Sequence, residues 1–351
     1  MRFRLSAGPS FWIMAAAYLG LMLAASAPSP LYVVYQQRWH FSAITLTTVF
    51  GVYVLVLLLA LLTVGGLSDF VGRKPVMLIS FALLVASMVV FARASGVAWL
   101  YAARILQGLA AGCSLGAVSA ALIDFAGARR LPLAALMNSL IPSLGLALGA
   151  LVAGGLVQFA PAPRVLVFVL LAILFVLVMA AMAVVPETSP RRAGAWPSLL
   201  PRVAVSRPIR GEFVRAIPGL VAPWAQVGFT LSLTTSLASA RFGITDHFLD
   251  GVVVGAVCGF SFAATVATRR VPPPGAAAAG CAGLIAGAVI TLVSLIGSWD
   301  AVFYAGSVLT GIGVGATLGA VMRALSVLPS PAERGEFFAA VYVVGYLAFS
   351  V

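Results

Sequence analysis

Long apolar segments alternate with short polar ones along almost the whole chain. In the first half, segments of spanning length lie at 11–36, 43–67, 75–93, 97–124, 132–158 and 163–185. After a polar stretch, they resume at 217–238, 247–267, 275–297, 301–325 and 337–351. Because a membrane-spanning helix needs about 20 apolar residues, the pattern predicts an all-α polytopic membrane protein with eleven spans, six before the polar stretch and five after it.

Composition excludes an ordinary soluble globule. The 351 residues are 62% hydrophobic and 9% charged, with a mean hydropathy of +1.12, which is more apolar surface than a soluble domain can bury. Cys113, Cys258 and Cys281 each lie in an apolar run, without the paired spacing of a zinc site or a disulfide framework. We therefore expect neither a metal nor a cofactor, and membrane lipid as the surrounding partner.

The net charge of +12 is explained by its position along the chain. Basic residues collect on the cytoplasmic side of membrane proteins, and here they alternate as an N-terminus inside requires. The outer loops hold only Arg38, Arg93, Arg164 and Arg241. The inner segments hold Arg2, Arg4, Arg73, Lys74, Arg129, Arg130, Arg191, Arg192, Arg202, Arg207, Arg210, Arg215, Arg269, Arg270 and Arg334. This distribution argues against a nucleic-acid partner.

The first span has a second interpretation as a signal peptide. Arg2 and Arg4 precede its apolar run, and the small residues Ala25 and Ala27 are typical of a cleavage site. Removal of this span would break the pairing of spans described next. Proline is also tolerated within membrane-spanning helices, which it kinks, so we expect a retained span kinked near Pro28.

A polar connection divides the chain near its middle. It is rich in proline, serine and arginine and predicts a cytoplasmic linker at 187–215, between an N-terminal half at 1–186 and a C-terminal half at 216–351. An internal repeat supports this division, because Leu106–Leu122 in the fourth span aligns with Leu309–Leu325 in the tenth. Complete repetition requires a twelfth span, on the order of 40 residues beyond Val351. The sequence is thus expected to be a C-terminally truncated chain, with a natural eleven-span protein as the alternative.

The loop between the second and third spans carries a specific motif. It reads Gly65-Gly-Leu67-Ser-Asp69-Phe70-Val-Gly72-Arg73-Lys74 and resembles the loop signature of the major facilitator superfamily, with Phe70 where that family usually has a basic residue. The resemblance implies two six-helix halves, eleven of their spans present here, around a substrate site at the midplane. It also implies alternating access, with charges that latch and release at a cytoplasmic gate. Asp124, at the inner end of the fourth span, is expected to join this gate, with simple capping of the helix end as the alternative.

Arg104, Gln107 and Gly108 resemble a second signature of the same family. Arg104 lies about seven residues inside the fourth span, roughly 10 Å deep, where a charged side chain must face a polar cavity or a partner. These three residues are expected in the transport pathway. Snorkelling of Arg104 to the outer surface is the structural alternative.

Further residues are assigned less specifically. Gly145, Gly149, Gly154 and Gly155 in the fifth span resemble the antiporter signature, although Leu146 replaces its proline, and such spacing also serves ordinary helix packing. Polar and aromatic residues within spans are candidates for a substrate cavity, with helix contact as the alternative for each. They are Tyr32, Tyr53, Asn138, Trp224 and Gln226.

These features predict a transporter and no enzyme. The favoured function is efflux of a small, largely apolar or drug-like molecule by a monomer in a bacterial inner membrane; Lys74 is the single lysine among 21 basic residues, as in GC-rich genomes. Uptake of a sugar or organic acid is one alternative, and a scaffold or sensor on a transporter fold is another. Protons are the coupling ion expected from the family, yet all nine acids, among them Asp246 and Asp250, lie in loops or at span ends, so no interior carboxylate is expected.

Overall fold

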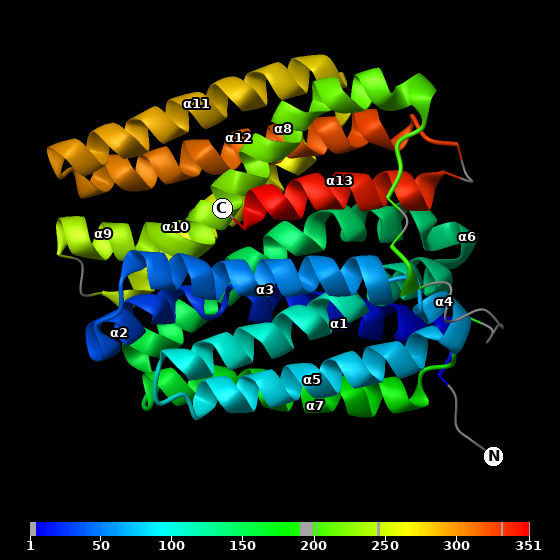
Figure 1. The fold of residues 1–351 in the computed structure, drawn as a ribbon, viewed down its shortest axis with the longest axis horizontal. Helices are drawn as coiled ribbons and strands as arrows, with labels where there is room; N and C mark the ends of the chain where they lie inside the picture. Colours follow the sequence, from blue (N-terminus) through cyan, green and yellow to red (C-terminus); the bar gives the residue numbers. More distant parts are fainter. Residues whose placement is uncertain (1–4, 190–198, 202, 244–245, 331–332, 351) are drawn as a thin grey trace. The chain divides into compact units, whose positions relative to one another are not determined.

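The computed structural model describes residues 5–189, 199–201, 203–243, 246–330 and 333–350, and its elements are helices (Figure 1). Five of the predicted inner basic residues fall outside these ranges. They are Arg2, Arg4, Arg191, Arg192 and Arg202.

The first predicted span forms two helices. Helix α1 covers Ala7–Ser26 and α2 covers Ser29–Trp39. The break falls at 27–28, because proline removes a backbone donor and favours the first turn of a new helix. Helix α3 (Ala43–Val64), the short α4 (Ser68–Val71) and α5 (Arg73–Ala92) follow.

The fourth and fifth spans form one helical element. Helix α6 runs through Val97–Phe159, and its one non-helical residue is Gly127, with φ 59° and ψ 178°. Only glycine adopts such a backbone readily, so Gly127 separates helical stretches at 97–126 and 128–159. The sequence predicts a non-helical connection at 125–131, whereas in the structure only Gly127 departs from helical geometry. Helix α7 covers Pro163–Val184 and ends the first six predicted spans.

The remaining elements complete five predicted spans. After η2 (Arg207–Ile209), helix α8 (Arg210–Phe229) passes through a π-helical stretch η3 (Thr230–Thr234) into α9 (Thr235–Phe242). Helix α10 (His247–Ala267) ends in η4 (Thr268–Arg270). Helices α11 (Pro273–Gly297), α12 (Asp300–Ser326) and α13 (Arg334–Phe349) follow.

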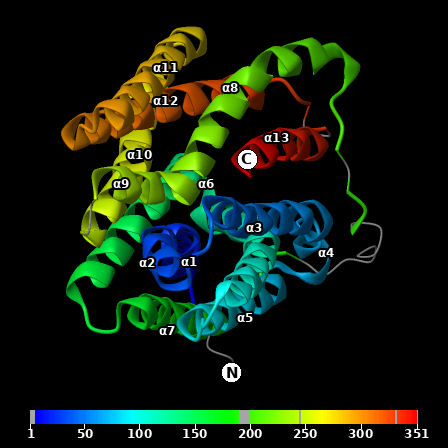
Figure 2. The same cartoon turned by 60° about the vertical axis from the view of Figure 1, so that its left-hand side comes forward.

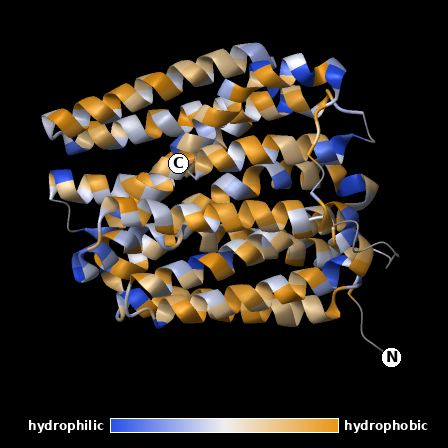
Figure 3. Ribbon diagram, in the orientation of Figure 1, coloured by the Kyte–Doolittle hydropathy of each residue, from blue (hydrophilic) through white to orange (hydrophobic). Residues whose placement is uncertain are grey.

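Within the described residues, nine helical stretches are long and apolar enough to cross a membrane. One of them, α6, contains two predicted spans, and α13 has only 16 residues. Hydrophobic residues cover the helices along their length, whereas hydrophilic residues gather toward helix ends (Figure 3). This is the pattern of a multi-pass membrane protein, because polar side chains on a lipid-facing surface find no hydrogen-bond partners.

The chain packs as two units that do not follow the predicted halves. One unit contains 1–25, 52–145 and 160–201, and the other contains 26–51, 146–159 and 202–351. The second unit gains early segments because α2 packs against α9 and α10. In the first unit α5 packs along α7, and in the second α11 lies beside α12 (Figure 2). The division into halves at the linker stays a prediction.

The internal repeat makes matching contacts in both units. A Cβ atom at Gly108 or Gly112 would lie 2.5 and 2.4 Å from the carbonyl oxygens of Tyr53 and Leu57 in α3. Their repeat partners Gly311 and Gly315 approach the carbonyl oxygens of Val257 and Ser261 in α10 equally closely. In each case two glycines four residues apart admit the backbone of one neighbouring helix, a standard way for membrane helices to pack closely.

Candidate functional site

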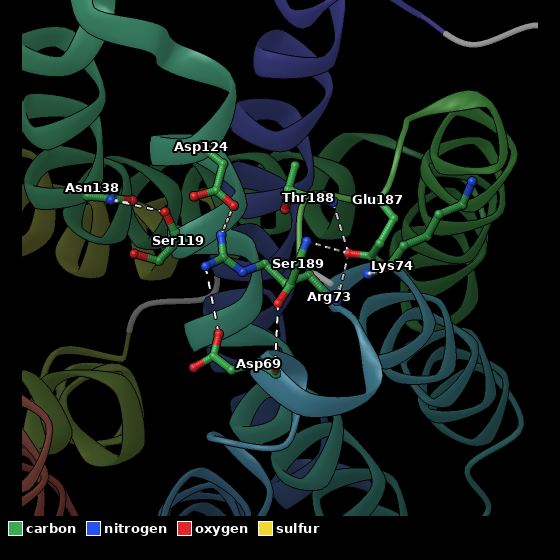
Figure 4. Close-up of polar contacts among 9 residues, drawn as sticks. All are labelled: Asp69, Arg73, Lys74, Ser119, Asp124, Asn138, Glu187, Thr188 and Ser189. Atoms are coloured by element: carbon green, nitrogen blue, oxygen red, sulfur yellow. Dashed lines mark hydrogen bonds and ion pairs between the residues drawn. The ribbon is translucent and has the colours of Figure 1, made fainter. Parts of the chain in front are cut away.

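An ion cluster lies where α3, α4, α5 and the first stretch of α6 meet (Figure 4). The Arg73 guanidinium pairs with the Asp124 carboxylate and lies 3.7 Å from the carboxylate of Asp69. Arg73 is 15% exposed, Asp124 32% and Asp69 63%. Three residues that the sequence assigns to a gate are thus together, in a wet setting where such pairs contribute about 0 to 1 kcal/mol.

Glu187 holds the start of α5 in place. Its Oε1 accepts hydrogen bonds from the backbone N–H groups of Arg73, Thr188 and Ser189, at 2.9 to 3.1 Å, and its Oε2 accepts one from Lys74 N–H at 3.0 Å. A carboxylate at this position satisfies N–H groups that every helix N-terminus leaves free and complements the helix dipole. Glu187 therefore fixes the backbone that carries Arg73.

Gly72 makes room for that carboxylate. Its φ is +100°, and an added Cβ would lie 2.7 Å from Oε2 of Glu187. Both the backbone conformation and the space require glycine here.

Lys74 completes the attachment of α5 to α7. Its ammonium group donates to the carbonyl oxygens of Ala183 and Val185, at 2.6 and 2.9 Å, which belong to the end of α7. Cations favour helix C-termini, whose carbonyls have no partners within the helix. Ser189 adds a bond from its hydroxyl to the Asp69 carbonyl, at 3.3 Å.

The two remaining residues of the loop motif shape its turn. Leu67 precedes α4 and donates its N–H to the Val64 carbonyl. Gly65 lies where an added Cβ would meet the Leu61 carbonyl at 2.2 Å. A shallow pocket of about 370 Å³ adjoins the cluster at the Gly127 bend, with Asp124, Arg129 and Arg130 in its lining.

Arg104 is fully buried in the first stretch of α6. Its Nη1 donates to Oε1 of Gln107 at 2.7 Å and to the Ala25 carbonyl at 3.3 Å. Gln107 in turn donates to the Ala24 carbonyl at 2.6 Å. Both carbonyls belong to the last turn of α1, where the break before α2 leaves them without helical partners. The side chain does not reach the surface, so the structure does not support snorkelling.

Aromatic rings enclose the same guanidinium. Its Cζ lies 5.0 Å from the ring centre of Tyr53 and 5.8 Å from that of Phe91. Such rings attract a cation through their negative faces, more strongly when water is excluded. Gly108, assigned with Arg104 to the pathway, provides the close contact with α3 described above, and its place in the pathway stays a prediction.

The candidate cavity residues make contacts at several different places in the structure. Tyr32 is fully buried and Tyr53 belongs to the Arg104 cluster. The Asn138 side chain donates to the Ser119 carbonyl at 3.3 Å across the α6 bend (Figure 4). Trp224 stacks edge-on against Tyr346 and Phe349, and Gln226 is partly buried two residues further along α8. A common cavity for all of them stays a prediction.

The predicted packing glycines lie in the second stretch of α6. A Cβ at Gly145 would meet that of Met22 at 2.3 Å, and one at Gly154 would meet the His247 carbonyl at 2.8 Å. Gly155 faces the Phe248 ring at 3.7 Å, and Gly149 is buried. Close packing at Gly145 and Gly154 is what such spacing serves in membrane helices, and an antiporter role stays a prediction.

Sequence reasoning missed two acids. Glu187 is the first residue of the predicted linker, and nothing in the local sequence marks it as a cap, because the helix that it caps begins 114 positions earlier. Asp250 was placed at a span end, yet its side chain is only 1% exposed. It heads the buried stripe of Asp250, Val253, Val254 and Val257 on α10. That helical spacing was the available signal of burial; Asp250 nevertheless lies in the first turn of α10, at the span end that the sequence predicts.

Comparison with known proteins decides the family. The sequence pattern of the Major Facilitator Superfamily matches residues 14–351, nearly the whole chain. The chain belongs to the major facilitator superfamily. It is accordingly a multi-pass membrane transporter and not an enzyme, in agreement with its helices and its loop motif.

Solved major facilitator structures share the fold. The nucleoside transporter NupG aligns with a TM-score of 0.71 and 12% identity, over 98% of this chain and 89% of that one. The human organic anion transporter MFSD10 (TETRAN) aligns with a TM-score of 0.65 and 20% identity, over 97% and 92%. No curated protein sequence matches the chain. At these identities the likeness shows the fold alone.

Proposed function

We propose that this major facilitator protein is a secondary active exporter of small, largely apolar molecules that are neutral or anionic. The observation that carries the proposal is the buried guanidinium of Arg104, held by Gln107 and by the last turn of α1. A charge buried at such cost inside a membrane helix is typically functional. Here it sits among aromatic rings that suit apolar substrates.

The charge of the site supports the substrate class. Among the described residues, Arg104 and Asp250 are the charged side chains that are buried, and Asp250 belongs to the other packing unit. A cation entering the surroundings of Arg104 would meet repulsion, whereas an anion or a neutral polar group would not. The nucleoside and organic anion transporters named above handle substrates of this kind.

The ion cluster supports alternating access. Arg73, Asp69 and Asp124 form a latch that is weak enough to open in each cycle, while Glu187 and Lys74 hold its backbone in place. We place this latch on the cytoplasmic side, with the N-terminus inside and the protein in a bacterial inner membrane. Basic residues around the latch, such as Arg129 and Arg130, agree with that orientation.

Transport in proteoliposomes tests the function. The purified full chain is reconstituted, and movement of a neutral dye, a lipophilic cation, an organic anion and a sugar is followed under proton and sodium gradients. We expect movement of the neutral or anionic probe. Arg104→Met should lower its rate about tenfold to a hundredfold, as expected for loss of charged hydrogen bonds worth about 1.5 to 3 kcal/mol.

Arg93→Met is the matched control, since Arg93 is an exposed arginine at the end of α5. It should transport normally, and the thermal melting of both variants checks that they fold. Transport of the cation alone would contradict the proposed substrate class. Failure to move any probe under any gradient would contradict transport itself and favour a scaffold or sensor.

A further inference from the structure

A buried polar group lies at the start of α10, in the packing unit that contains neither the loop motif nor Arg104. The Asp250 carboxylate is 1% exposed, and its Oδ2 lies 3.2 Å from Nδ1 of His247, which is 20% exposed. The two residues are three positions apart on one helical face. The pair therefore joins a buried carboxylate to an imidazole that still reaches the surface of its unit.

Two polar atoms at this site lack a hydrogen-bond partner within the described chain. They are Oδ1 of Asp250 and the hydroxyl oxygen of Tyr304 on α12, and both are buried. Tyr304 packs against the cluster of Ala238, Val253 and Phe303, and Val253 lies one helical turn beyond Asp250 on α10. Buried polar groups are almost always satisfied in proteins, and an unsatisfied one often marks a functional site.

Neighbouring charges do not neutralise the carboxylate. Asp246 caps α10 through the N–H groups of Phe248 and Leu249, and Asp300 is exposed at the start of α12. On α9, Arg241 donates to the carbonyls of Leu295 and Ile296 instead. On α2, Arg38 is exposed. Among these groups His247 is the basic one that contacts Asp250.

The surroundings are rigid enough to hold the pair in place. The backbone N–H of His247 donates a hydrogen bond of 2.8 Å to Oε1 of Gln158, at the end of α6. A Cβ added to Gly251 would lie 2.5 Å from the Ala150 carbonyl, so α6 and α10 touch through their backbones here. The end of α6 thus holds in place the first turn of α10, which carries the pair.

We propose that Asp250 and His247 form a proton-binding pair whose protonation is coupled to transport. Burial disfavours the carboxylate ion, whereas the helix N-terminus and the imidazole favour it, so these influences oppose one another at Asp250. In one state an imidazolium faces a carboxylate. Uptake of one proton by the carboxylate gives a neutral acid beside the imidazolium, and release of one proton from the imidazolium leaves a neutral imidazole beside the carboxylate.

The coupling part of this inference rests on the proposed transport function, but proton binding is tested without any substrate. The full chain in lipid nanodiscs is subjected to pH steps, and infrared difference spectra follow the carbonyl stretch of protonated carboxyl groups. We expect a band from a carboxyl group shielded from water. It should vanish in Asp250→Asn, change in His247→Gln and persist in Asp300→Asn, the matched control on the exposed neighbouring carboxylate.

Two further measurements keep the proposal testable if Asp250→Asn fails to fold. Asp250→Glu keeps the carboxyl group and should move the band rather than remove it. The chain has two histidines, so in His40→Gln the nitrogen NMR signals of the remaining imidazole report His247 alone. Spectra that are identical in wild type and folded Asp250→Asn, or an imidazole that does not respond to pH, would overturn the proposal.

Coupling is tested in proteoliposomes with a substrate that the wild type moves. One coupled proton and a gradient of about one pH unit allow accumulation of about tenfold. Asp250→Asn should abolish accumulation and keep exchange of substrate between equal pools. Full accumulation by Asp250→Asn would overturn coupling while transport stands. Absence of transport in the wild type would contradict the proposed function and also the coupling of protonation to transport. Proton binding by the pair would then be decided by the infrared and NMR spectra alone.

Discussion

At the scale of single residues, basic side chains satisfy helix C-termini throughout the described chain. Arg104 binds the last turn of α1, Lys74 the end of α7, Arg241 the end of α11, and Arg323 the carbonyls of Thr268 and Val271 after α10. Lipid supplies no donors for the last carbonyls of a helix. A positive side chain nearby replaces the missing water and complements the helix dipole.

Gly72 offers a sharp test at this scale. Gly72→Ala forces a side chain into positive φ and against the Glu187 carboxylate, which four hydrogen bonds hold in place. We expect a loss of about 1 to 3 kcal/mol of unfolding free energy, measured by denaturation in detergent. Gly335→Ala is the control, because nothing lies within 4 Å of that helical position. Equal stability of both variants would contradict the interpretation of Gly72.

At the scale of elements, α5 is held at its first turn by contacts from distant parts of the sequence. Glu187 caps its N-terminus, Lys74 reaches α7, and Arg73 reaches α6. The backbone bonds are permanent anchors, whereas the exposed ion pairs are exchangeable. If the ion pairs form the gate that we propose, it can open without unfolding the loop that carries it.

The cap is tested by removing its carboxylate. Glu187→Ala leaves four backbone N–H groups without their acceptor and should lower the unfolding free energy by about 1 to 2 kcal/mol. Glu212→Ala is the matched control, since Glu212 is an exposed acid in the first turn of α8. Thermal melting of both variants in detergent gives the comparison. A loss in Glu212→Ala as large as in Glu187→Ala would count against a specific cap.

The latch is tested by exchanging its charges. Arg73→Asp and Asp124→Arg should each impair transport, and the double variant should recover part of the rate because the pair is restored in reverse. The expected coupling is about 0.5 to 1 kcal/mol, as for a partly exposed pair. Transport assays of the four proteins form a double-mutant cycle. Additive losses would show that the pair does not act as a unit, and Arg129→Asp controls for a charge change nearby.

At the scale of the whole molecule, the internal repeat is a feature of backbone contact as well as sequence. Gly108 and Gly112 receive α3 as Gly311 and Gly315 receive α10. The glycines fall in the aligned segments because a side chain at these positions would separate the two helices. Each unit therefore contains the same pair of closely packed helices, as expected from a repeated transporter half.

Membrane orientation is tested on one helix. Ser298 precedes α12 and Ser326 ends it, about 40 Å apart at 1.5 Å per residue. With native cysteines replaced by serine, Ser298→Cys should react with an impermeant maleimide from outside the cell. Ser326→Cys should react only after permeabilisation. Labelling of both from one side would show that α12 does not span, and reversed sides would place the N-terminus outside.

The sequence by itself determined the membrane class, the family and most helix positions. Apolar run lengths reflect membrane thickness, and motif residues such as Asp69, Gly72 and Arg73 are adjacent in the chain. Arg104 was equally visible as a charge within an apolar run. The burial of Arg104 could not be predicted, because the same side chain can either extend to the membrane surface or pair with groups inside the protein.

Only the tertiary structure decided which distant groups meet. Glu187 reaches the backbone N–H of Arg73 across 114 positions of sequence separation, and Gln158 reaches the backbone N–H of His247 across 89. The Asp250 stripe predicts an inward face but not the imidazole contact or the unsatisfied oxygen. The hydrophobic pattern of a helix determines which of its faces is buried. The hydrogen-bond partners of its polar groups depend on which other helix ends lie nearby, and the local sequence does not encode that arrangement.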